Sequence, residues 1–175
     1  MATTAQKAPS GLLPIGATTG LVVQISVSSG GVPKLRVPRA IVTPDGLAGD
    51  AQSNTKFHGG ADRALCIWGE EIIDMLRGEG HNLAPGYTGE NLTIRGINWN
   101  LVQPGVALHI GDSVEAVVTS FTRPCKTNAR WFRGGDYGRI SQVKHPGWSR
   151  VYARVLRGGN ITEGCAVVLD VETDR

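Results

Sequence analysis

The sequence is poor in charge and in aromatic residues, and it lacks any hydrophobic run long enough to span a bilayer. Of its 175 residues, 19% are charged and 6% are aromatic. The apolar stretch near the N-terminus is interrupted by Pro14, Gly16 and Gly20, and it does not have the pattern of a signal peptide. We therefore expect a soluble, cytoplasmic protein that has no membrane partner.

Cysteine is also scarce. Cys66, Cys125 and Cys165 are widely spaced, odd in number and without a CxxC pair, which argues against a framework of disulfides and against a zinc site. At least one of these residues should be a free thiol. The reactivity of that thiol becomes the central question.

Glycine and proline, in contrast, are abundant. There are 24 glycines and 9 prolines, while 41% of the residues are hydrophobic. This composition argues against a disordered chain, a collagen or a helical bundle, and it favours short strands joined by tight turns. The length suits one domain. We expect it over residues 20–171, after a flexible lead-in (1–19) and before a frayed tail (172–175).

Alternation of apolar and polar residues predicts half-buried strands, and other short apolar runs predict further ones. The predicted strands cover residues 23–27, 106–110, 114–118, 151–155 and 167–169. One helix is predicted from Gly69 to Arg77, where Ile72, Ile73 and Leu76 share a face, and a second is expected after Cys125. The fold class is therefore mainly β: a closed or nearly closed β-barrel with a few short helices at its rim.

Positive charge is concentrated in one part of the chain. Residues 121–157 contain nine Lys or Arg against Asp136 alone, a net charge of +8, whereas the rest of the chain carries −5. Such a local cationic face suits a bound anion. Lys34, Arg36 and Arg39 follow the first predicted strand in a loop that should lie at the rim, where they could join Arg123 or Arg130 in holding the ligand's anionic tail.

The segment around Cys125 is the most informative. Its neighbours Arg123, Lys126 and Arg130 would stabilise a thiolate, as would a helix beginning beside it, and Thr127 offers a hydroxyl to an anion. The alternative is a buried structural cysteine. Cys66 lies in an apolar run and is interpreted as core, and Cys165 is interpreted as structural.

Two glycine-rich segments could also bind a ligand. In the first, His58 could relay a proton, Asp62 could orient it, and Gly59 and Gly60 could expose backbone N–H groups to an anion. In the second, Glu90 and Asn91 could hydrogen-bond a heterocycle. Both segments could equally be ordinary turns that satisfy their own backbone groups.

Taken together and in this order, these segments resemble the MOSC family, named for the C-terminal domain of molybdenum cofactor sulfurases. The small stand-alone bacterial members are the most similar. The matching residues are Gly46-Leu47 with Gly49-Asp50, His58-Gly59-Gly60 with Asp62-Arg63-Ala64, Gly89-Glu90-Asn91-Leu92-Thr93, Arg123-Pro124-Cys125, and Tyr152-Ala153-Arg154-Val155 before Gly158-Gly159. One departure is Gly164-Cys165, where the family often has Gly-Asp.

The resemblance implies a β-barrel in which Cys125 lies in a pocket and either ligates the molybdenum of a bound molybdopterin or carries sulfur as a persulfide. Arg63 would then pair with a carboxylate or with the cofactor. The chain lacks an aminotransferase-like desulfurase domain, so we expect no pyridoxal phosphate site and a separate protein as donor.

Three functions are compatible with these features. The favoured one is molybdenum-dependent reduction of a small-molecule substrate, an N-hydroxylated compound, with electrons from a separate donor protein. The second is a sulfur carrier or transferase that uses a Cys125 persulfide and a sulfur donor protein. The third is a non-catalytic module that binds a pterin or another anion. Nucleic acid is not an expected ligand, because only Trp131 lies between closely spaced basic residues.

The proposed role of His58 gives a first prediction. If His58 relays a proton, replacing it with Gln should lower turnover about 100-fold or more while leaving the molybdenum content unchanged. Steady-state kinetics and metal analysis of the same preparation check this. A variant that keeps its full rate in an assay limited by chemistry, but melts at a lower temperature, would mean that His58 only closes a turn.

Overall fold

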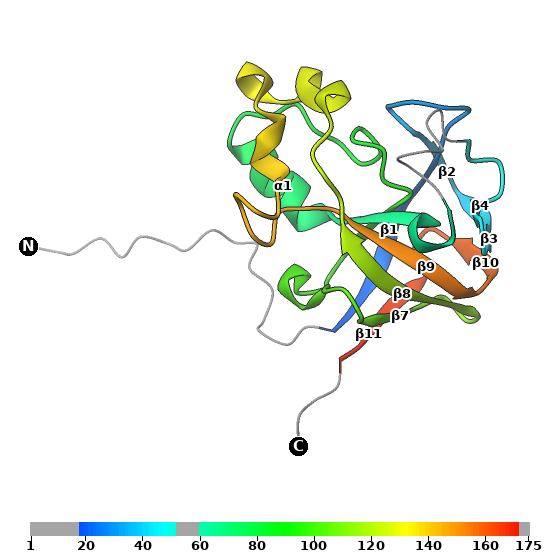
Figure 1. Ribbon diagram of the computed structural model, residues 1–175. Coiled ribbons are helices and arrows are strands. Elements are labelled where there is room, and N and C mark those ends of the chain that lie inside the picture. Colours follow the sequence, from blue (N-terminus) through cyan, green and yellow to red (C-terminus); the bar gives the residue numbers. More distant parts are fainter. Residues whose placement is uncertain (1–17, 52–59, 172–175) are drawn as a thin grey trace, which may run out of the picture.

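The computed structural model describes residues 18–51 and 60–171. Its strands in these ranges are β1 (Thr19–Val27), β2 (Leu35–Val37), β3 (Arg39–Thr43), β4 (Gly46–Leu47), β5 (Leu65–Gly69), β6 (Leu92–Arg95), β7 (Ala107–Ile110), β8 (Val114–Phe121), β9 (Val151–Arg157), β10 (Gly159–Thr162) and β11 (Ala166–Asp170). Figure 1 shows them wrapped around one core. The prediction of a mainly β fold is confirmed.

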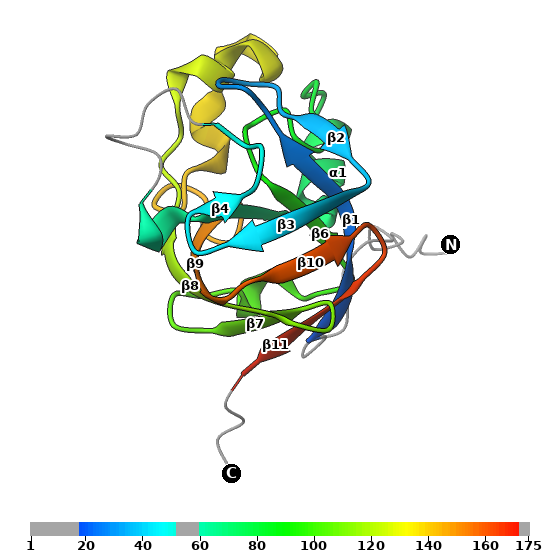
Figure 2. The same cartoon turned by 90° about the vertical axis from the view of Figure 1, so that its right-hand side faces the viewer.

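The main sheet closes into a barrel. Its strands follow the order β11-β7-β8-β9-β5-β6-β1, and β1 then pairs with β11, with Thr19 opposite Val168. These neighbours are antiparallel except β5 and β6, which are parallel. β2 extends the sheet beyond β1, and β3, β4 and β10 form a smaller sheet that lies in front of the barrel in Figure 2.

The apolar alternation in the sequence matches the interior of the barrel in most strands. Val114, Ala116 and Val118 of β8 are buried. In β1, however, the buried apolar residues are Val22 and Ile25. The pairing of β1 with β6 shifts register between Val22 and Gln24, and such a bulge turns the residues on its two sides toward different faces. The simple alternation of residues 23–27 therefore gave the wrong inward face for part of this strand.

Helical structure is short and lies at the edge of the barrel. The helix α1 (Glu70–Gly78) buries Ile72, Ile73 and Leu76, as its sequence predicted. Instead of a second α-helix, Cys125 is followed by a run of 3₁₀ turns: η3 (Lys126–Trp131), η4 (Arg133–Gly135) and η5 (Tyr137–Ile140). The remaining 3₁₀ turns of the described ranges are η1 (Ala61–Arg63) and η2 (Trp99–Leu101). Within the described ranges, every helix is too short or too polar to cross a membrane.

Close approach between two backbones makes Gly20 critical for barrel closure. Gly20 pairs with Val167 at the β1–β11 seam, and a Cβ at this position would lie 2.0 Å from the carbonyl oxygen of Arg95. Gly20→Ala should therefore lower the free energy of unfolding by about 1–3 kcal/mol or more. The matched control is Gly78→Ala, because a Cβ there has no neighbour within 4 Å among the described residues.

Urea unfolding of both variants checks this expectation. Gly78→Ala lies at the end of α1 and should be neutral or stabilise the protein by about 0.4–1 kcal/mol. Equal stability of Gly20→Ala and wild type would contradict the close packing of β1 against β6.

Candidate functional site

A cavity of about 320 Å³ opens at the end of the barrel where β8 ends and where β6 and β9 begin. This volume is at the lower end of the range for small-molecule sites. Its walls come from six segments of the chain. The lining residues are Gly31, Val32, Lys34, Ala51, Arg63, Cys66, Thr88, Gly89, Asn91, Cys125, Thr127, Asn128, Arg150 and Tyr152. The charged members of this described lining are all cations: Lys34, Arg63 and Arg150.

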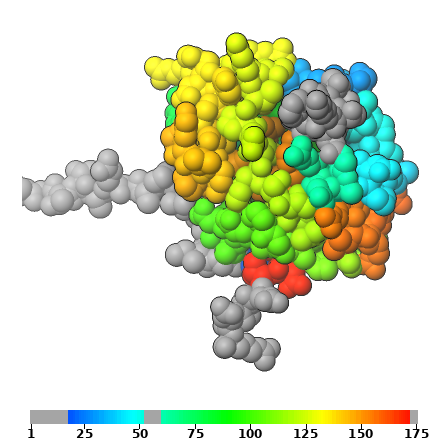
Figure 3. All heavy atoms as spheres, viewed as in Figure 1, coloured from blue at the N-terminus to red at the C-terminus, as the bar shows by residue number. Residues whose placement is uncertain are grey.

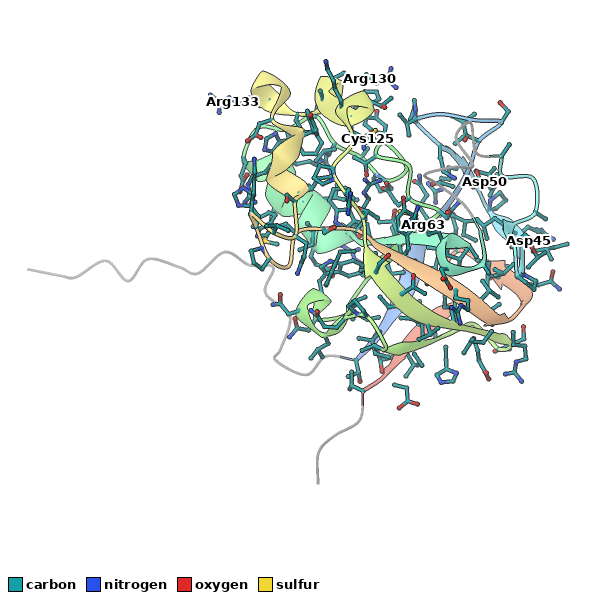
Figure 4. All side chains as sticks on the ribbon, viewed as in Figure 1. Asp45, Asp50, Arg63, Cys125, Arg130 and Arg133 are labelled. Carbon is teal, nitrogen blue, oxygen red and sulfur yellow. The ribbon has the colours of Figure 1, made fainter. Side chains whose placement is uncertain are left out.

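Cys125 lies in the wall of the cavity, the position that the resemblance implied, and its reactivity stays a prediction. It caps the N-terminus of η3, and its carbonyl accepts the N–H of Asn128 at 2.9 Å. Its Sγ lies 3.0 Å from Oγ1 of Thr127, which lines the same wall. Figure 4 labels Cys125 above Arg63 at this end of the molecule. The side chain is only partly buried, so a ligand in the cavity can reach its sulfur.

Arg150 is the most deeply placed cation, and sequence reasoning missed it. The residue is 5% exposed, and its Nη1 donates to the carbonyl of Thr88. The chain just before it is fixed, because Trp68 and Trp99 donate their indole N–H groups to the carbonyls of Trp148 (3.2 Å) and Ser149 (2.9 Å). The Nε of Arg150 is buried without a hydrogen-bond partner in the described part of the chain. A guanidinium is thus held rigidly beside the cavity with one donor unused.

Cys66 forms part of the cavity wall rather than belonging to the core alone. Burial raises the pKa of Cys66 to about 11, and this effect outweighs the opposing influence of the nearby Arg150 cation. The thiol is therefore neutral near pH 7. Cys66 thus lines the cavity but adds no negative charge to it.

Tyr152 was also missed, although it belongs to a motif that the sequence singled out. It faces Cys66 across the β5–β9 pair, and the guanidinium carbon of Arg63 lies 5.6 Å from the centre of its ring. Burial, followed by the proximity of Cys66, raises the pKa of Tyr152 to about 12. The phenol therefore keeps its proton at neutral pH.

Lys34 and Asn91, both predicted ligand-binding residues, meet at Asp50. Lys34 forms a buried ion pair with Asp50, and the amide of Asn91 donates to the same carboxylate at 2.8 Å. The side-chain oxygen of Asn91 also accepts the N–H of Cys66 at 3.1 Å. Asp50 therefore neutralises Lys34 inside the protein, and Asn91 ties β5 to the loop after β4.

Glu90 and Asp62 are engaged elsewhere. Glu90 is fully buried, and its two oxygens accept the Gly86 N–H at 2.7 Å and the Thr88 hydroxyl at 2.8 Å. These are the loop-forming contacts that the sequence left open as an alternative. Asp62 forms an exposed ion pair with Arg154. Neither residue is among the lining residues.

The predicted basic residues are divided between the cavity mouth and the outer surface. Arg36 pairs with Glu163 through Nη2 at 2.7 Å, and Arg39 is exposed on β3, so both lie apart from the lining. Arg130 reaches the mouth, because it donates to the carbonyl of Val32 and lies 4.6 Å from the ring centre of Trp131. Arg123 is exposed on the segment that leads to Cys125.

Only part of the predicted glycine loop lies within the described residues. Gly60 is exposed with a φ of 85°, and it caps η1, which carries Arg63 into the lining. His58 and Gly59 lie outside the described residues. Figure 3 shows the teal residues of η1 beside the yellow-green segment that follows β8. The described end of the glycine loop and the segment around Cys125 thus lie at one face.

Comparison with known proteins identifies the architecture. The model of the MOSC domain matches residues 54–168, which carry Cys125, Arg63, Asn91, Arg150 and Tyr152. The chain belongs to the MOSC family. YflK from Bacillus subtilis (strain 168) is 28% identical over 126 residues, which are 71% of this chain and 56% of YflK. The chain therefore spans little more than half the length of that relative.

Solved structures agree on the fold. YiiM from Geobacillus stearothermophilus superimposes with a TM-score of 0.66 at 22% identity, over 87% of this chain and 75% of that one. YiiM from Escherichia coli gives a TM-score of 0.63 at 22% identity, over 89% and 72%. These likenesses show the same barrel fold.

The three thiols of this MOSC domain should differ in reactivity. At neutral pH, iodoacetamide should modify Cys125 first, because burial raises the pKa of both Cys66 and Cys165. With a pKa of about 11, Cys66 exists as thiolate at roughly one part in 10⁴ at pH 7, so it should react last. Peptide mass mapping over time measures the order, and unfolding in urea should equalise the three rates. Equal reaction of Cys66 and Cys125 in the folded protein would contradict this assignment.

Proposed function

We propose that the cavity binds a molybdenum cofactor, with the Cys125 thiolate as the ligand that the protein supplies to the metal. The observation that carries this proposal is the position of Cys125 in a cavity whose described charged lining residues are all cations. A molybdopterin is an anion through its phosphate and its dithiolene sulfurs. Its charge therefore complements this lining.

The residues present fit such a group in a further respect. The orphaned Nε of Arg150 is a buried donor that lacks a partner from the described chain, so this guanidinium has capacity left for an anion. Cys125 would supply the protein's ligand to the metal, with Arg63 and Arg150 holding the anionic part of the cofactor.

The reaction we propose is the reduction of an N-hydroxylated compound. The N–O bond breaks, two protons and two electrons are consumed, and the products are an amine and water. A separate donor protein supplies the electrons. When bound, the cofactor supplies a metal that can change oxidation state and accept oxygen.

The chain itself would supply the protons. His58 stays the predicted proton donor. Tyr152 lines the cavity and keeps its proton at neutral pH, but its raised pKa makes it a weak acid, so it would orient the reacting group rather than protonate it. Arg63, beside the Tyr152 ring, would hold the substrate or the cofactor in place.

Metal and pterin analysis of protein from a cofactor-competent host tests this proposal. Wild type should contain close to one molybdenum and one pterin per chain. Cys125→Ser should lose most of the molybdenum, because a neutral hydroxyl is a poor substitute for a thiolate ligand. The matched control is Cys165→Ser, whose thiol lies outside the cavity lining and which should retain the wild-type molybdenum content.

Intact mass distinguishes the alternative of sulfur transfer. A wild-type protein without molybdenum that gains the mass of one sulfur atom at Cys125, after incubation with a sulfur donor protein, would contradict metal ligation and support a persulfide carrier. Equal molybdenum in wild type and Cys125→Ser would also contradict the proposal.

A further inference from the structure

The buried guanidinium of Arg150 lacks an internal counter-ion in the described part of the chain. No carboxylate there forms an ion pair with it, although the residue is only 5% exposed. Its Nη1 donates to the carbonyl of Thr88, which is a neutral acceptor. Burying an unpaired charge is costly, so such a group calls for an anion from outside the chain.

The acidic groups nearby are already engaged. Asp50 pairs with Lys34 and accepts from Asn91 and from the N–H of Ser28. Glu90 is bound by Gly86 and by the hydroxyl of Thr88, on the loop whose carbonyl Arg150 contacts. Glu90 thus moderates the local charge from a distance but leaves the donors of Arg150 unmatched.

The two other ionisable groups beside Arg150 stay neutral. Cys66 and Tyr152 both lose their proton only in strongly alkaline solution, because they are buried. Neither can provide a negative charge at neutral pH. The Nε of Arg150 therefore remains a buried donor without an acceptor, beside a cavity that can hold a ligand.

We propose that Arg150 forms an oxyanion-binding subsite in the deep wall of the cavity, where its guanidinium donates to a tetrahedral oxyanion of the phosphate or sulfate class. Arg63, which lines the same cavity, adds positive charge. A guanidinium suits this ligand, because its planar edge can donate to two oxygens of one anion. The subsite deepens the proposed function and rests on it for the role of the cavity. Its ligand is either the phosphate ester of the cofactor or a separate oxyanion.

Nuclear magnetic resonance can observe the Nε–H of the Arg150 guanidinium directly. The Nε–H of a buried arginine gives its own signal, and Arg150→Lys identifies it, because lysine keeps the charge but lacks that atom. The experiment titrates inorganic phosphate into the full chain, produced in a host that cannot make the cofactor. The Arg150 signal should move in a saturable way, and chloride at equal ionic strength should not move it.

The affinity for phosphate gives the second measurement. Arg150→Lys should raise the dissociation constant about tenfold or more, since a charged hydrogen bond is lost. The matched control is Arg157→Lys, at the far end of β9, where the exposed guanidinium pairs with Glu115 and should not affect binding. If Arg150→Lys does not fold, correlations through its aliphatic carbons assign the signal in the wild-type protein.

Two outcomes would overturn the subsite. One is an Arg150 signal that phosphate moves no more than chloride does, and the other is equal phosphate affinity in wild type and Arg150→Lys. Because this titration needs no cofactor, it can succeed even if the protein never binds molybdenum. Failure of the proposed function and failure of the subsite are therefore distinguishable.

A repeat with protein from a cofactor-competent host identifies the source of the anion. If the Arg150 signal no longer responds to phosphate, the phosphate ester of the bound cofactor occupies the subsite. If it still responds, the subsite takes a separate oxyanion, such as an anionic substrate group. Either result supports the subsite and assigns its occupant.

Discussion

Pairing between β1 and β11 is the constraint on which the rest of the molecule depends. These two strands lie near opposite ends of the described chain, and their hydrogen bonds turn an open sheet into a ring. A small barrel fills its own interior, here with residues such as Ile25, Leu108 and Ile110. A ligand therefore cannot enter the core and must bind at an end, where loops from distant parts of the chain converge.

The binding end combines rigid strands with buried charge. Near an apolar core, electrostatic interactions are stronger than in water, and an unmatched charge is correspondingly costly. Asp50 neutralises the charge of Lys34 within the protein. Arg150, in contrast, forms no ion pair among the described residues, and its Nε has no hydrogen-bond partner there. The contrast separates a cation that stabilises the fold from one that is prepared for a ligand, although both line the same cavity.

Local sequence was enough to predict the features that depend on neighbouring residues. Apolar alternation predicted β8 and β9, and the cations and proline around Cys125 drew attention to a thiol that does line a cavity. The structure reveals Arg150 and Tyr152 beside it only through the register that sets Cys66 opposite Tyr152. That register cannot be predicted from the spacing of residues along the chain. Arg36 illustrates the opposite error, because a basic residue near a loop looked suited to an anion but pairs with Glu163 on the outer surface.

The connection between β8 and β9 has a separate consequence. These strands pair closely along their length, while residues 122–150 between them form only 3₁₀ turns and irregular chain at one end of the barrel. This excursion carries Cys125 near its start and Arg150 at its end. Its two ends are joined by a hydrogen bond from the N–H of Thr122 to the carbonyl of Arg150, so both are held by the barrel strands. Its middle takes no part in strand pairing, although Phe132 and Ile140 are buried in the core. Substitutions at its exposed positions can therefore alter which molecules reach the thiol while the barrel and the two anchored residues stay the same.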